Sequence, residues 1–152
     1  MATRGFEFVG ALGGASSTPR IKDFTLGAAA AHKVGDLMLI QSDGYMDQVT
    51  GTTTEVTCVM QEAIAAAAIT AGTTKGKCAI ITSDQIWRCS MDASTTSIVV
   101  GYTKKCDTAD CNTLDADDGT NGNAILYDAS DLDDEGNVLA QVVFADTTFG
   151  NA

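Results

Sequence analysis

The 152-residue sequence predicts an all-β fold, either a small β-barrel, a β-tulip-like domain or a sandwich, with at most short helices and an extended N-terminal arm. Short apolar or alternating runs recur along the chain, separated by segments rich in glycine, threonine and aspartate, a spacing typical of barrels and sandwiches. In residues 35–49, an apolar run, an Asp43-Gly44 pair and a returning run follow one another. Asp-Gly pairs adopt positive φ angles at low cost, so this stretch predicts a β-hairpin with a type I′ turn.

Residues 1–24 are expected to form the arm and residues 25–152 the β-rich domain. Phe6-Glu7-Phe8-Val9 alternates as a short strand does, and the glycines and serines that follow it predict a flexible tether. A lone strand is unstable in water, so it must pair either with its own domain or with a neighbouring chain. We expect it to pair with a neighbour, the alternative being that Phe6 and Phe8 complete the core of the domain itself. The candidate partner contacts are Arg4, Phe6, Phe8, Val9 and Arg20.

Further strands are expected over 20–26, 55–64, 77–82, 85–91, 97–102, 124–127 and 138–144. Residues 77–91 predict either a second hairpin or one bulged strand, and a helix over 61–69 competes with the end of its preceding strand. Asn112 is expected to cap a turn of helix over 113–117. Trp87, the single tryptophan, is expected in the core and not on a ligand platform.

Nine basic and twenty acidic side chains give a net charge of −11. This excess repels phosphate backbones and anionic membrane surfaces. No apolar run approaches the roughly 20 residues that a membrane-spanning helix needs. We therefore expect neither nucleic acid nor a membrane as a partner.

The five cysteines are odd in number and follow no zinc-type spacing. The chain opens without a secretory pattern, which favours reduced thiols in a cytosol. Cys106 and Cys111 are spaced so that they could close a loop disulfide, but a reducing compartment argues against it.

Catalytic and metal-binding motifs are incomplete. The only histidine, His32, has no recognisable nucleophile beside it, and the glycines of 10–14 lack the spacing of a nucleotide site. Residues 131–136 match the first positions of a calcium loop, but the twelfth position is Val142, and 115–119 is similarly incomplete. We expect no catalytic, cofactor-binding or metal-binding residues and no enzymatic activity.

The order of motifs between about residues 25 and 100 resembles that of tailed-bacteriophage head decoration (cement) proteins, including the lambda-type one. The motifs that carry the resemblance are the alanines 28–31, Lys33-Val34-Gly35-Asp36, Asp43-Gly44, the run 58–64 with the alanines after it, and the run 77–82 with Trp87-Arg88. The acidic segment 104–135 and the last strand extend beyond a minimal lambda-type domain.

This resemblance implies a non-enzymatic virion protein on the exterior of an icosahedral head, made in the bacterial host cytoplasm. It implies a homotrimer that clamps neighbouring major capsid subunits and uses no cofactor. Two alternatives stay open: another virion part, such as a tail-tube or fibre subunit, and a small carbohydrate-binding or hydrolase barrel.

Overall fold

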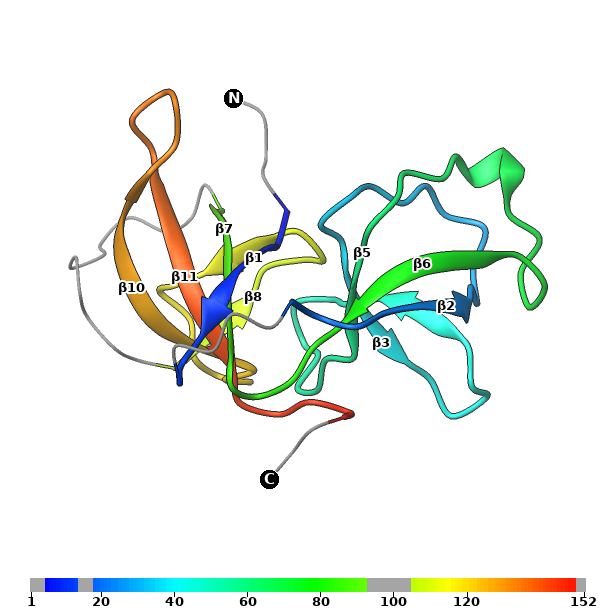
Figure 1. Ribbon diagram of the computed structural model, residues 1–152, viewed down its shortest axis with the longest axis horizontal. Coiled ribbons are helices and arrows are strands. Elements are labelled where there is room, and N and C mark those ends of the chain that lie inside the picture. Colours follow the sequence, from blue (N-terminus) through cyan, green and yellow to red (C-terminus); the bar gives the residue numbers. More distant parts are fainter. Residues whose placement is uncertain (1–4, 14–17, 93–104, 150–152) are drawn as a thin grey trace.

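The computed structural model of the chain describes residues 5–13, 18–92 and 105–149. In these ranges the fold is all-β, as predicted, with eleven strands in two sheets and a single 3₁₀ turn, η1 (Ala66–Ala68). Figure 1 shows the two sheets side by side, the six-stranded one on the left and the five-stranded one on the right. The strand expected over 97–102 lies outside the described residues.

The six-stranded sheet is ring-like. Its strands, in spatial order, are β1 (Glu7–Ala11), β7 (Gln85–Met91), β11 (Val138–Phe144), β10 (Ala124–Leu132), β8 (Lys105–Thr108) and β9 (Thr113–Asp115). β9 also pairs in parallel with the end of β7, which closes the last five strands into a ring. The ring is irregular and is not a regular barrel.

The five-stranded sheet has the order β2 (Ile21–Thr25), β6 (Lys75–Ile80), β5 (Cys58–Met60), β3 (Leu37–Ile40) and β4 (Met46–Gln48). Its outer strands approach each other where Leu26 forms a bridge with Met46. All the pairings of the five strands are antiparallel.

Two apolar clusters form the core, and strand alternation separates them. Leu37 and Val59 point toward the six-stranded sheet and join Trp87 and Phe144 in the larger cluster. Their neighbours in sequence point the other way, into a smaller cluster within the five-stranded sheet. Trp87 is buried, as predicted.

The central hairpin is confirmed, but its turn is not the predicted type I′. β3 and β4 pair antiparallel, and the amide of Gly44 donates to the carbonyl of Gln41. Gly44 has a φ of +86°, whereas no non-glycine residue of the described chain has positive φ. This is the three-residue loop that ends in a left-handed glycine, so Asp43 keeps an ordinary conformation and caps the amide of Tyr45.

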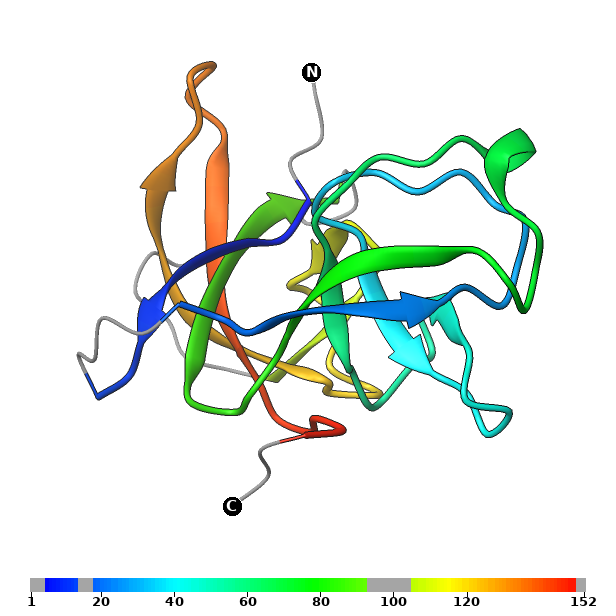
Figure 2. The same cartoon turned by 45° about the vertical axis from the view of Figure 1, so that its right-hand side comes forward.

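Neither form expected for residues 77–91, a second hairpin or one bulged strand, is found. β6 and β7 belong to different sheets, and the chain crosses from one to the other between them (Figure 2). The helical turn over 113–117 is also wrong, since Thr113–Asp115 is strand β9 and the amide of Asn112 is itself bound by Asp110. The strand over 55–64 shortens to β5, and the competing helix is reduced to η1.

The expectation that the first strand pairs with a neighbouring chain is corrected. β1 pairs antiparallel with β7 of its own chain, and the amide of Phe6 donates to the carbonyl of Gly35. Phe6 is 2% exposed, with its ring 5.5 Å from that of Phe144. Burial of a phenylalanine stabilises by about 1.5–3 kcal/mol, which explains why this strand pairs within its own domain.

Candidate functional site: an apolar groove and a polar pocket

An apolar groove of about 380 Å³ lies where β1 of one sheet faces β2 of the other. Its lining combines the start of β1, the approach to β2 and parts of three other segments. The lining residues are Phe6, Glu7, Phe8, Thr18, Pro19, Ile21, Val34, Gln61, Ala79 and Trp87.

β1 positions two phenylalanines in this groove, with a bulge after them. The register of β1 and β7 shifts between Phe8 and Gly10, so Val9 is the extra residue, and it is exposed. Phe8 meets Trp87 edge to face with the ring centres 5.6 Å apart. Such aromatic contacts hold the groove wall in one conformation.

The rim of the groove is apolar and carries little charge. Ile21 is 51% and Val34 59% exposed, large values for branched apolar side chains. The one ionisable side chain of the lining, Glu7, is paired with Arg88 at 3.0 Å, and Arg88 also pairs with Asp131 at 3.2 Å. These two contacts raise the pKa of Arg88 and keep it charged. The lining of the groove thus has no unpaired charge, although the net charge of the chain is −11.

The predicted partner contacts are partly brought together here. Phe6 and Phe8 line the groove, although Phe6 lies too deep to be a surface contact. Arg20 is exposed next to Ile21, and its carbonyl accepts from the amide of Ile80. Val9 is exposed but does not line the groove. Arg4 lies outside the described residues.

Sequence reasoning missed the rim residues Ile21 and Val34. Ile21 belongs to an alternating run, and alternation by itself does not say which face is covered. Val34 lies between charged and glycine residues with no periodic pattern. Only the pairing of β1 with β7 brings the two residues alongside Phe8.

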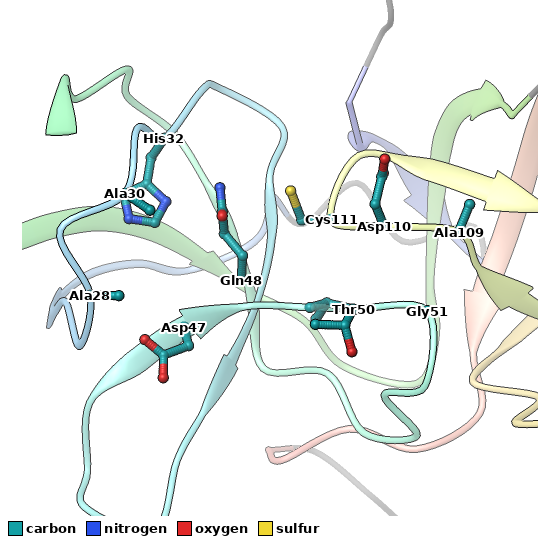
Figure 3. Close-up of a pocket in the computed structure, with 11 residues that line it drawn as sticks. Ala28, Ala30, His32, Asp47, Gln48, Thr50, Gly51, Ala109, Asp110 and Cys111 are labelled. Atoms are coloured by element: carbon teal, nitrogen blue, oxygen red, sulfur yellow. The ribbon is translucent and has the colours of Figure 1, made fainter.

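A second hollow, of about 430 Å³, opens between the segment before β3, the end of β4 and the loop between β8 and β9. Figure 3 shows His32, Gln48 and Cys111 converging from these three segments, with Asp47 beside Ala28. The lining residues are Ala28, Ala30, His32, Asp47, Gln48, Val49, Thr50, Gly51, Ala109, Asp110 and Cys111. We call this hollow the His32 pocket.

Backbone and side-chain hydrogen bonds fix the pocket. The main chain of His32 exchanges two hydrogen bonds with Ile64, at 2.9 and 3.0 Å. Asp36 lies just beneath the pocket, where its Oδ2 accepts from the amide of Lys33 and from Nε2 of Gln48, both at 3.0 Å. The backbone at His32 and the side chains of Asp36 and Gln48 are therefore held before any ligand arrives.

Burial governs the ionisation of the pocket. It lowers the pKa of His32 below its ordinary 6.5, although Asp36 and Asp47 act in the opposite direction. His32 is thus neutral at pH 7. Burial, reinforced by Asp36 and Asp110, raises the pKa of the Cys111 thiol to about 12, so this cysteine is not a thiolate nucleophile.

The His32 pocket also concentrates unsatisfied polar atoms. Within the described chain, five buried side-chain nitrogen or oxygen atoms have no hydrogen-bond partner, and four of them belong to this cluster: both ring nitrogens of His32, Oδ1 of Asp36 and Oδ1 of Asp47. A buried polar group without a partner costs about 1–3 kcal/mol. Such a concentration calls for an explanation, and a bound group with complementary polar atoms would supply one.

In the acidic loops, by contrast, the carboxylates accept hydrogen bonds from other groups of the protein. Asp131 accepts from Arg88 and Gln141, and Asp133 accepts from the amides of Glu135 and Asn137. Among the described residues, no group of three or more histidine, cysteine, aspartate or glutamate side chains is placed to hold a metal ion. In the same part of the chain no helix is long and apolar enough to cross a membrane.

None of the five cysteines forms a disulfide bond. Cys58 and Cys78 lie in the smaller core cluster among methionines, where a hydrogen bond with Cys78, together with burial, raises the pKa of Cys58. These thiols act as small apolar side chains.

No protein-family model, curated protein or solved structure matched the chain.

Proposed function

We propose that this chain is a structural protein of a tailed-bacteriophage head, bound to the outer surface of the icosahedral shell, where it clamps neighbouring major capsid subunits. The single observation that carries the proposal is the apolar groove, whose one ionisable lining residue is ion-paired, on a chain of net charge −11. The order of motifs between residues 25 and 100, which resembles that of head decoration proteins, supplies the identity of the partner.

The groove suits a permanent contact with another protein. Ile21 and Val34 offer branched side chains that are more than half exposed, and burying the remaining surface of each would contribute about 1 kcal/mol. Beside them, β1 pairs only with β7 in the described structure. An edge strand with an unpaired side can accept a strand from a partner, which adds backbone hydrogen bonds to the apolar contact.

The distribution of charge supports an outward orientation. The exposed loops of β8 to β11 carry many carboxylates, and acidic loops keep a particle surface soluble. The docked form is a homotrimer in this proposal, since cyclic symmetry closes apolar contacts without open-ended growth. Nucleic acid and lipid are not partners of such a surface.

Co-sedimentation with purified heads of the phage that encodes the chain tests the proposal. Wild-type protein should pellet with the heads, and the bound amount should saturate as the protein concentration is raised. A double variant, Ile21→Asp with Val34→Asp, should bind at least about 30-fold more weakly, corresponding to roughly 2 kcal/mol. The matched control is Leu132→Asp, because Leu132 is 60% exposed but lies outside the groove.

The control should bind as wild type does, and all three proteins should melt at similar temperatures because the changed side chains are on the surface. Wild-type protein that stays in the supernatant would contradict the proposed function. Equal weakening by Leu132→Asp would leave shell binding intact but remove the groove as its site.

A further inference from the structure

The His32 pocket has no role in the proposed shell contact, so its ligand has to be inferred from the pocket itself. Oδ1 of Asp47, which lines the pocket, is an unpaired acceptor, and the neutral His32 adds one more acceptor and one donor. No lysine or arginine lines the pocket. Its complement is therefore a positively charged group rich in hydrogen-bond donors.

The number and kind of groups in the pocket select among cations. A divalent metal ion with ligands at about 2.1 Å requires neighbouring oxygens about 3 Å apart, and the described residues provide no group placed in that way. An ammonium group needs no such close set of ligands, because each of its N–H groups donates to one acceptor at about 2.8 Å. A quaternary ammonium has no N–H to donate and is recognised by aromatic rings, of which the pocket lining has none.

The walls indicate what the charged group is attached to. The methyl groups of Ala28, Ala30 and Ala109 and the side chain of Val49 line the pocket. These surfaces suit an unbranched aliphatic stem that ends in a charge, since such stems lie along apolar atoms while the charged end finds polar partners.

We propose that the His32 pocket binds a primary alkylammonium group, with the ammonium at Asp47 and His32 and the stem along the alanines. The source of the group is either a free diamine or the side chain of a lysine. Nothing in this inference depends on shell binding, and its test uses the free protein.

The experiment is an NMR titration of ¹⁵N-labelled protein at pH 7.5 with cadaverine (1,5-diaminopentane). The amides next to Ala30, Gln48 and Asp110 should shift together and saturate, with a midpoint of the order of millimolar, as expected for so small a ligand. Choline and 1,5-pentanediol, which lack N–H⁺ and charge respectively, should leave these amides in place.

Paired variants separate the pocket from the general acidity of the chain. Asp47→Asn should weaken cadaverine binding at least tenfold, whereas Asp23→Asn removes the same charge from exposed β2 and should change it less than twofold. A parallel titration with Nα-acetyl-lysine-methylamide identifies the source of the ammonium group. Tighter binding of cadaverine indicates a free diamine, and tighter binding of the lysine derivative indicates a lysine side chain.

The proposal is overturned if neither amine produces saturable shifts, if choline shifts the same amides equally, or if both variants lose binding alike. Because the comparison of cadaverine with choline and the diol uses wild-type protein, it decides the matter even if Asp47→Asn folds poorly.

Discussion

Replacing Phe6 by alanine tests whether the first strand belongs to the domain. Phe6 is 2% exposed, lies in the larger core cluster and packs on Phe144. Truncation of a buried phenylalanine costs about 3–5 kcal/mol, out of a total of about 5–15 kcal/mol for a domain of this kind. With a shift of about 2–4 °C per kcal/mol at this length, Phe6→Ala should lower the melting temperature by roughly 6 to 20 °C.

The assay is urea unfolding followed by tryptophan fluorescence, since Trp87 is the only tryptophan and is 1% exposed. The matched control is Val9→Ala in the same strand, because Val9 is 41% exposed and should change the stability by less than about 0.5 kcal/mol. Deletion of residues 1–18 should destabilise at least as much as Phe6→Ala. If Phe6→Ala and Val9→Ala lie within about 1 kcal/mol of wild type, β1 is not docked in the free protein, and the mobile arm is the correct description.

Three further outcomes are expected. The pKa of His32 is lowered in the folded state. The stability that depends on neutral His32 is therefore complete above pH 6.5 and is lost as the pH falls below that value, at up to about 1.4 kcal/mol per pH unit. Urea midpoints measured between pH 7.5 and 5.5 should show this slope in wild type and lose it in His32→Gln. Alkylation in denaturant without reductant should label five cysteines, and a protected Cys106–Cys111 pair would contradict reduced thiols. Chelator should leave the melting temperature unchanged, because Asp131 and Asp133 already have protein partners, and a fall of many degrees would show that an ion is bound there.

The sequence predicted the elements that depend on neighbours along the chain. β3, β4 and the return at Gly44 follow from an apolar run and an Asp-Gly pair, and β10 and β11 follow from two further runs that begin or continue with apolar residues. The turn type was wrong because positive φ was expected of both turn residues, whereas the three-residue loop needs it only at Gly44.

Errors arose where the partner of a strand is distant in sequence. The flexible composition after residue 10 indicates a tether, and it conceals the fact that β1 pairs with β7, nearly eighty residues further along. In the same way, the short link between β6 and β7 predicts a hairpin, although the chain uses it to pass between sheets. Loop closure costs little more as a loop grows, so proximity along the chain is a weak guide to which strands pair.

Both candidate sites lie at the seam between the two sheets, and this explains why no sequence motif indicated them. The segment between β2 and β3 contributes Val34 to the groove and His32 to the pocket, although it contains no strand itself. Its backbone is held instead by bonds from His32 to Ile64 and by Asp36. A segment fixed by tertiary contacts has no periodic constraint on its side chains, so the chain can place an apolar residue toward one site and a polar residue toward the other within three positions. Residues of this kind can be assigned to a site only after the two sheets have been assembled around them.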